Sequence, residues 1–251
     1  MGAKKVITVS GSDVQVVRKD IKNLHLAVYP PDGHVRVAVP PHVTDDNVRL
    51  AVVSKLSWIK RQQKDFKDQP RQSERKYISG ECHYVFGKRC RMELIERDEK
   101  PYVKQLKSGK LKLFVRPGAS VEAKEKVLND WYREQLKNVI PELLEVWQPV
   151  IGKKAKDWGI KKMKTKWGSC NIQQRRIWLN LELAKKPLEC LEYILVHELI
   201  HLCERLHNDR FKVLLDKSMP NWQTREKLLN KSPLAHQNWL QVKAPSFYPI
   251  P

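Results

Sequence analysis

The sequence predicts an α+β fold, in which a β-rich N-terminal region packs on a mainly helical core that has a small sheet of its own. Two observations support this class. Runs rich in β-branched residues fill residues 5–40 and 79–115, and several alternate apolar with polar side chains, a pattern typical of strands. Apolar residues at helical spacing recur from residue 121 to 147 and again after Pro187. The 251 residues are enough for one large domain or two small ones.

The N-terminal region begins with four predicted strands, at residues 6–9, 14–17, 24–28 and 35–39. Pro30-Pro31-Asp32-Gly33 is a strong turn signal and joins the last two strands as a hairpin. A single helix is predicted from Thr44 to about Asp68, because acidic residues fill its first turn and apolar residues follow at helical spacing. Residues 69–78 are polar and basic, and they are expected to form a linker or an exposed loop.

A second set of strands follows, at residues 84–86, 92–95, 102–103 and 111–115. A long helix is predicted from Val121 to Trp147, and Pro141 is expected to kink or divide it, because proline has no backbone N–H to donate. No internal repeat is expected from the sequence. The predicted domains are residues 1–118, a β-rich region with one helix, and residues 119–251.

The segment from residue 155 to 181 is predicted to form two short strands around a turn. Lys161 to Lys166 is the first strand, Trp167-Gly168-Ser169-Cys170 is the turn, and Ile177 to Leu181 is the returning strand.

A helix then begins at Pro187, since the first turn of a helix tolerates proline, and it is predicted to run to about Leu206. From Tyr193 to Leu202 it is apolar nearly all round, as buried helices are. Two short helices, near residues 208–218 and 221–231, complete the fold.

The most informative motif of the chain lies in this helix, as His197-Glu198-Leu199-Ile200-His201, with His207 further on. Residues i and i+4 share one face of a helix, so His197 and His201 can offer two imidazole nitrogens to one metal ion. Glu198 lies beside that face, where a carboxylate can reach a metal-bound water. The alternative is a structural helix whose polar side chains find other hydrogen bonds. His207, as a third ligand, argues against that alternative.

The composition indicates a basic protein of a reducing compartment. The net charge of +20 favours polyanionic partners, nucleic acid first and an anionic membrane surface second, although a basic surface can also serve solubility alone. The five cysteines form no Cys-x-x-Cys pair, which indicates reduced thiols and a cytoplasmic location. The basic N-terminus lacks the apolar core of a signal peptide. No apolar stretch is long enough to span a membrane.

Several stretches follow one another in an order that identifies a family. They are Met163 to Cys170, Ile177 to Asn180, Tyr193 to Leu202, then His207 and Phe211, and Met219 to Trp222. This succession resembles the YgjP-like metallopeptidase family, which is related to the minigluzincins and, more distantly, to SprT-like proteases. The segment from Gly80 to Gly87 and the helix around Trp131-Tyr132-Arg133 resemble the N-terminal half of that family.

The resemblance implies a zincin-like metallopeptidase domain at residues 119–251 that binds Zn²⁺. It implies a general base and three metal ligands, which map to Glu198 and to His197, His201 and His207. The sequence departs from the family at Leu206 and Lys212, on either side of the third ligand, and this puts the surroundings of that ligand in doubt.

Three further residues are candidates for substrate contact. Ser169 lies in the predicted turn, at the expected rim of a cleft, and Cys170 beside it could approach the metal. The alternative for this turn is a structural role, with Trp167 packed under the active-site helix. Arg225 could bind substrate or pair with a carboxylate. An edge strand near residues 175–181 is expected to hold an extended peptide by β-augmentation.

Three classes of function remain open at this point. The favoured class is a zinc peptidase acting on peptides or proteins, and the basic surface suits work near nucleic acid. The second is a zinc-dependent hydrolase of phosphoanhydrides such as nucleoside triphosphates. The third is a basic module that docks nucleic acid or a larger protein assembly around a structural zinc. Glu198 argues against the third class, because a structural site needs no general base.

Overall fold

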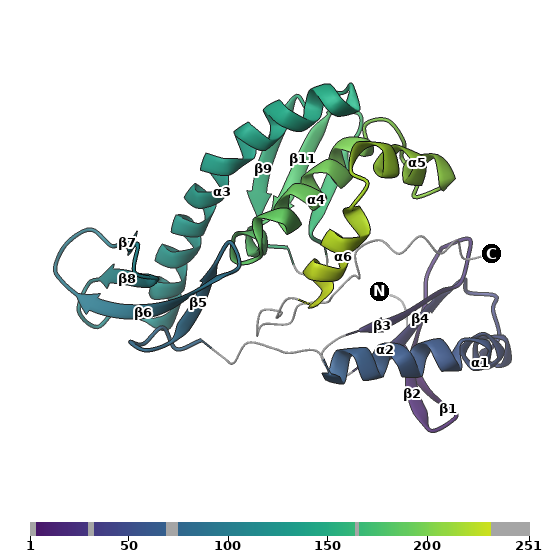
Figure 1. The fold of residues 1–251 in the computed structure, drawn as a ribbon. Coiled ribbons are helices and arrows are strands. Elements are labelled where there is room, and N and C mark those ends of the chain that lie inside the picture. Colours follow the sequence, from purple (N-terminus) through teal and green to yellow (C-terminus); the bar gives the residue numbers. More distant parts are fainter. Residues whose placement is uncertain (1–3, 30–32, 69–74, 164–165, 232–251) are drawn as a thin grey trace. The chain divides into compact units, whose positions relative to one another are not determined.

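The computed structural model describes residues 4–29, 33–68, 75–163 and 166–231. The described residues before position 69 form one compact unit, and those from 75 onwards form a second (Figure 1). Six α-helices and three small mixed sheets make up these residues, which confirms the predicted α+β class. Among the described residues, no helix is both long and apolar enough to cross a membrane.

The first unit is a mixed sheet with two helices. Its strands, β1 (Lys4–Val9), β2 (Ser12–Arg18), β3 (His25–Tyr29) and β4 (His34–Val39), have the order β1-β2-β4-β3. The inward valines of the sheet form one apolar core with Val48, Val52 and Ile59 of the helices. β3 and β4 pair antiparallel, which confirms the predicted hairpin, although Pro30 to Asp32 of its turn lie outside the described residues.

The single helix predicted from Thr44 to Asp68 is wrong, because two helices occupy this stretch. α1 (Asp45–Ser54) begins at Thr44, whose side chain accepts a hydrogen bond from the backbone N–H of Asn47. Lys55 then leaves the helical conformation, and α2 (Leu56–Asp68) begins behind it. The break follows Val52-Val53-Ser54, residues with a low intrinsic preference for the helix interior.

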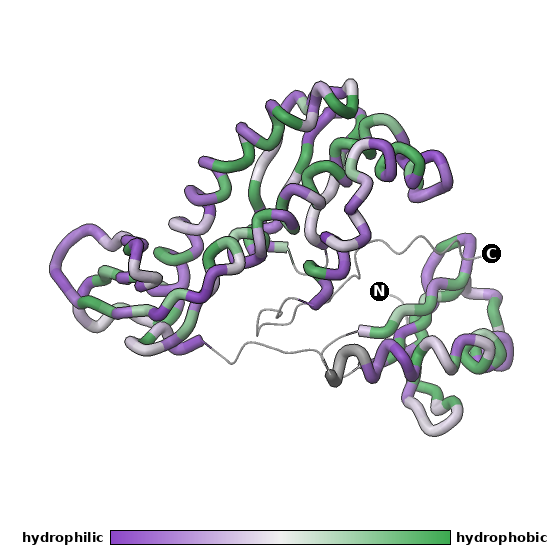
Figure 2. The backbone as a smooth tube through the Cα atoms, in the orientation of Figure 1, coloured by the Kyte–Doolittle hydropathy of each residue, from purple (hydrophilic) through white to green (hydrophobic). Residues whose placement is uncertain are grey.

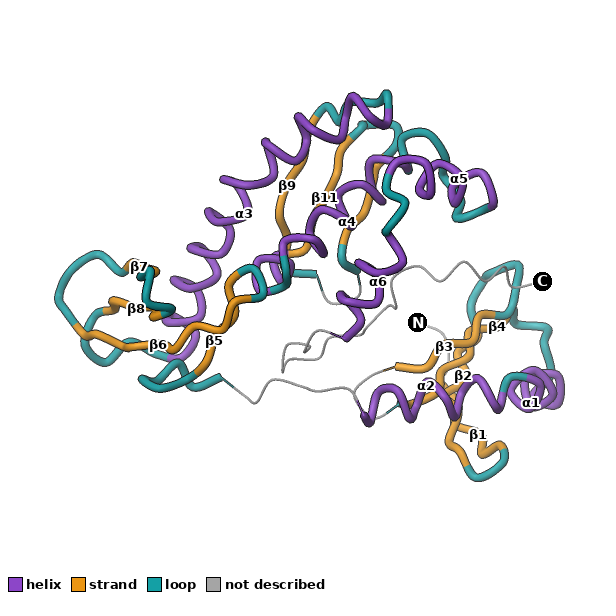
Figure 3. Tube along the Cα trace, viewed as in Figure 1, coloured by secondary structure: helices purple, strands orange, loops and turns teal. Residues whose placement is uncertain are grey.

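The second unit begins with another four-stranded sheet and a long helix. The strands are β5 (Cys82–Val85), β6 (Lys88–Glu96), β7 (Tyr102–Gln105) and β8 (Lys110–Val115). α3 (Val121–Ile151) passes through Pro141 without interruption (Figure 3), so the predicted division there is wrong. Leu136, Ile140 and Leu144 are buried around the proline, and this packing outweighs the loss of one helical hydrogen bond.

The two four-stranded sheets share one topology. In each, the first two strands are antiparallel, the second pairs parallel with the fourth, and the third pairs antiparallel with the fourth. The turns match as well, because Ser10-Gly11 and Phe86-Gly87 both have positive φ angles. Thr44 and Ser120 both cap the helix that follows. Ser10 is as far from Phe86 in the sequence as Thr44 is from Ser120.

The chain therefore contains an internal structural repeat, and the expectation that it has none is wrong. A strand needs apolar side chains on one face and a turn needs a residue that accepts positive φ, and neither requirement fixes residue identity. The repeat is preserved in the pattern of apolar residues and turns.

The remainder of the second unit is a small sheet covered by helices. β10 (Gly168–Asn171), β11 (Arg176–Asn180) and β9 (Asp157–Lys161) lie in that order, and a short 3₁₀ helix (Leu181–Lys185) follows. The prediction that residues 167–170 form a turn is wrong, because β10 pairs antiparallel with β11. The reversal lies at residues 172–175 instead, where Arg175 has a positive φ.

Three helices end the described chain: α4 (Leu188–Ile200), α5 (Asp209–Ser218) and α6 (Trp222–Lys231). α4 is largely hydrophobic (Figure 2) and buried along most of its length, as predicted, but it ends at Ile200 rather than near Leu206. The division into domains at residues 1–118 and 119–251 stays a prediction.

Candidate metal centre

The end of α4 brings the three histidines together. His197 lies in the last turn of α4, His201 caps the helix, and His207 comes just before α5. If the helix continued, His207 would lie roughly 15 Å along the axis from His197, because a helix rises about 1.5 Å per residue. The chain turns instead, and the ring centroid of His207 lies 5.0 Å from that of His197 and 4.7 Å from that of His201.

One side chain supports all three imidazoles. The ring of Phe211, fully buried in α5, lies 4.8 Å from the rings of His197 and His201 and 4.9 Å from that of His207, centroid to centroid. Asn208 fixes the start of α5 by accepting a hydrogen bond from the backbone N–H of Phe211. The start of α5 therefore positions both His207 and Phe211.

The histidines are poised to bind as neutral imidazoles. Burial and the two neighbouring histidines hold the pKa of His197 well below its usual value, and burial lowers the pKa of His207 to about 4. Nδ1 of His201 lies 3.1 Å from the carbonyl oxygen of Glu204. Since a carbonyl can only accept, Nδ1 of His201 must donate there, and Nε2 keeps its lone pair for a metal.

This donor set fits a divalent metal ion. One nitrogen from each histidine can be chosen so that all three lie within 4.8 Å of one another, and Nε2 of His197 is 2.9 Å from Nε2 of His207. Neutral imidazoles suit zinc and also copper, iron and nickel. The arrangement supports a metal site and leaves the identity of the metal to experiment.

Glu198 lies beside the triad in a space that a glycine provides. Its side chain is buried, and burial raises its pKa to about 8, while the charge of Lys166 acts in the opposite direction. The backbone of Gly168 in β10 passes so close that a Cβ atom there would lie 2.6 Å from Oε1 of Glu198. Glu198 thus sits between the motif helix and the first strand of the small sheet.

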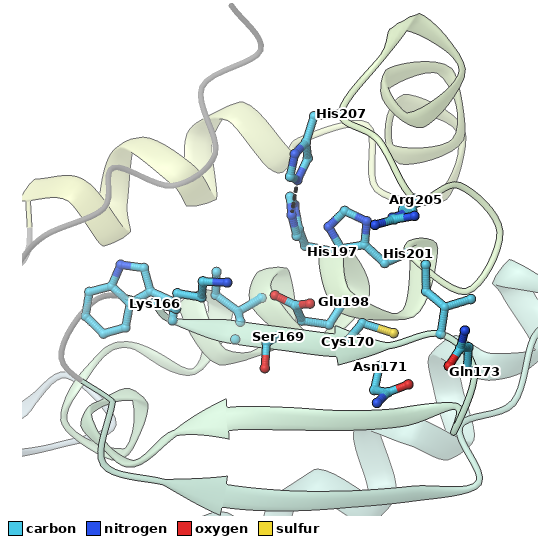
Figure 4. Close-up of a pocket in the computed structure, with 14 residues that line it drawn as sticks. Lys166, Ser169, Cys170, Asn171, Gln173, His197, Glu198, His201, Arg205 and His207 are labelled. Atoms are coloured by element: carbon cyan, nitrogen blue, oxygen red, sulfur yellow. Dashed lines mark hydrogen bonds between the residues drawn. The ribbon is translucent and has the colours of Figure 1, made fainter. Parts of the chain in front are cut away.

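The triad and Glu198 open into a cleft of about 730 Å³. Its lining includes every residue of β10, Ile172 and Gln173 of the reversal that follows it, and two cations, Lys166 and Arg205 (Figure 4). Arg205 is not among the residues predicted for the site, because the longer helix predicted there would have placed it on a helix face.

The two candidates in β10 differ in orientation. The sulfur of Cys170 points to the side of Glu198 and His201, whereas the hydroxyl of Ser169 points away from them (Figure 4). Burial and the charge of Glu198 raise the pKa of the Cys170 thiol to about 12, so the thiol is protonated at neutral pH. Contact of Ser169 or Cys170 with substrate remains a prediction.

Arg225 lies in α6 and forms an ion pair with Glu192 of α4. The other carboxylate oxygen of Glu192 accepts a hydrogen bond from the indole of Trp147 in α3. Arg225 does not line the described cleft. Of the two roles considered for it, the structure provides the carboxylate partner.

A buried amide that the sequence analysis did not select holds the chain leading into β10. The side chain of Asn180 donates to the carbonyl oxygens of Met163 and Lys166, at 3.0 and 2.6 Å, and accepts from the backbone N–H of Glu182. Asn180 is fully buried, and its contacts place Lys166 at the cleft.

Comparison with known proteins gives one family match and one similar solved structure. The sequence profile described as YgjP-like, metallopeptidase domain matches residues 22–232. Among solved structures, the chain is similar to the metallopeptidase zymogen of Pyrococcus abyssi abylysin, with 23% identity and a TM-score of 0.34, over 36% of this chain and 91% of that one. No curated protein matches the chain.

Proposed function

The chain belongs to the YgjP-like metallopeptidase domain family, and from this premise we propose that it is a zinc-dependent peptidase of the HExxH type. One observation carries the proposal most directly. Three neutral imidazoles converge beside a buried carboxylate, and all four side chains line one cleft. A purely structural metal site has no use for the carboxylate.

The residues divide the chemistry between them. A divalent metal held by the three histidines would polarise a peptide carbonyl and make a water molecule more acidic. Glu198 accepts the proton of that water and passes it to the departing amine. Burial raises the pKa of Glu198, which makes this carboxylate a stronger base than an exposed glutamate.

The edge of β10 is the proposed support for an extended peptide. The expectation that residues 175–181 supply this edge is wrong, because β11 is paired on both sides. β10 is an outer strand among the described strands of its sheet, and all its residues line the cleft. A peptide added there would form backbone hydrogen bonds beside Glu198.

The test compares two variants of one helix. The full chain is loaded with Zn²⁺ and assayed on a mixed pool of labelled peptides. Glu198→Gln is expected to keep its metal and to lose about 10² to 10⁴ of the rate, the range typical of a general base. Glu189→Gln, an exposed position in α4 outside the cleft, is expected to leave the rate unchanged. Undiminished hydrolysis by Glu198→Gln would contradict the role of Glu198.

The nucleoside triphosphate alternative is tested on the same samples. Release of phosphate that depends on Glu198, without cleavage of any peptide, would replace the peptidase proposal with a phosphoanhydride hydrolase.

We further propose a cytoplasmic protein with a nucleic-acid or protein-assembly partner. All five cysteines are free, and the net charge of +20 favours polyanions. Binding to duplex DNA that weakens steeply with added salt is expected. Absence of binding at low salt would contradict the nucleic-acid partner.

A further inference from the structure

We propose that the cleft selects peptides that carry an acidic side chain on each side of the scissile bond. This inference rests on the proposed peptidase function and names its substrate class. It depends on the charges that line the cleft and on where they lie.

The described lining of the cleft is positive apart from one buried carboxylate. Lys166 and Arg205 are its two cationic side chains, and Glu198 is its one carboxylate. An acidic side chain that enters the cleft is therefore attracted by these two cationic side chains.

Arg205 is available to such a side chain. Arg205 is exposed, and its guanidinium makes no hydrogen bond or ion pair with any residue that the structure describes. The adjacent acid, Glu204, is turned elsewhere, because one carboxylate oxygen accepts from the backbone N–H of Leu206 and the other lies 3.9 Å from Arg210. By contrast, Lys162 and Arg225 of the same unit are each paired with a carboxylate.

The two cations lie on opposite sides of Glu198 and His201 in the cleft. Figure 4 shows Lys166 on one side of Glu198, and His201 with Arg205 on the other. Lys166 comes just before β10 in the chain, and its backbone is fixed by Asn180. Arg205 belongs to the turn that follows α4.

An extended peptide along β10 would pass both cations. Each residue of a strand advances about 3.3 Å, so the four residues of β10 match a short run of substrate centred on Glu198. One end of that run lies towards Lys166 and the other towards Arg205. A carboxylate within about two residues of the scissile bond on either side reaches a cation, whereas a lysine there is repelled.

The experiment uses peptides that share one scissile sequence and differ only in their flanks. Glutamate, glutamine or lysine is placed on the amino side, on the carboxyl side, or on both. Values of kcat/KM are measured at low and high salt for the zinc-loaded full chain. The wild type is expected to prefer the glutamate peptides to the lysine peptides by about tenfold, the combined size of two partly exposed ion pairs. High salt should reduce this ratio.

Variants that reverse the charge of one cation identify the flank of the peptide on which that cation acts. Arg205→Glu is expected to reverse the preference on one flank, and Lys166→Glu on the other. The ratio between peptides is the readout, so a change in overall rate does not affect the result. Lys104→Glu, an exposed position in β7 outside the cleft, makes the same change in net charge and should leave both ratios unaltered.

The two proposals fail in different ways. Equal cleavage of all peptides, or a preference that survives both reversals, would overturn the acidic selectivity and leave the peptidase intact. Cleavage of none of them, with release of phosphate from nucleoside triphosphates, would overturn the peptidase and the selectivity together.

Discussion

Gly168 leaves the space that the Glu198 carboxylate occupies. A Cβ atom at Gly168 would lie 2.6 Å from Oε1, 2.7 Å from Cγ and 2.9 Å from Cδ of Glu198. The φ angle of Gly168 is not in the left-handed region, so the glycine is required by the close approach of the two residues and not by backbone strain.

Gly168→Ala is therefore expected to displace Glu198 while preserving the fold and the metal. An added methyl group would push the carboxylate away from its position beside the triad, and hydrolysis should fall by about a hundredfold or more. The measurements are kcat/KM on a labelled peptide and metal content per chain.

Gly159→Ala is the matched control for that variant. A Cβ atom there would meet the ring of Trp178 at 2.5 Å, so the same small sheet is crowded at a position away from Glu198. It should lower the melting temperature with little change in activity per folded molecule. Equal loss of activity in both variants would show that the effect of Gly168→Ala comes from the sheet.

Phe211→Leu is expected to weaken metal binding about tenfold to a hundredfold. Leucine retains much of the apolar volume but removes the ring that contacts all three imidazoles, and residues that orient metal ligands have effects of about this size. The measurement is a competition with a chelator of known affinity. Leu215→Ala, a buried position in the same helix and outside the described cleft, is expected to reduce stability and not metal affinity.

The protein is expected to lose stability in mild acid because of His83. Burial lowers the pKa of His83 to about 4, and the pKa in the unfolded chain is about 6.5. Between these values the unfolded state binds more protons, so the free energy of unfolding decreases as the pH falls from about 6.5 to 4, by up to about 3 kcal/mol. Urea unfolding of the wild type and of His83→Gln at pH 7 and pH 5 measures this. An equally steep decrease in His83→Gln would assign the effect to other groups.

The motif residues could be predicted because their arrangement is local. The spacing of His197 and His201 places both on one helix face whatever the rest of the chain does, and the apolar residues around them predict burial. The same motif places Glu198 beside that face, within reach of a metal-bound water, and the family resemblance implies the same role. By contrast, His207 reaches the other ligands only because α4 ends at Ile200. No residue in the sequence predicts that the helix ends there.

Other parts of the site depend on contacts between distant segments. Gly168 was assigned to a turn because glycine and serine favour turns, yet β11 pairs with this stretch and makes it a strand. Asn180 is predicted from the sequence only as part of a strand, and its role depends on hydrogen bonds to the carbonyl oxygens of Met163 and Lys166. Side-chain partners of this kind are set by tertiary packing, which periodicity cannot report.

The proposed function requires that the three histidines form one metal site and that Glu198 acts beside it without binding the metal. The most direct test is metal content per chain, by elemental analysis, for the wild type, Glu198→Gln and His207→Ala. We predict about one zinc per wild-type chain, the same content in Glu198→Gln and a large loss in His207→Ala. A wild-type protein that holds no stoichiometric metal after purification without chelators would contradict the metal site.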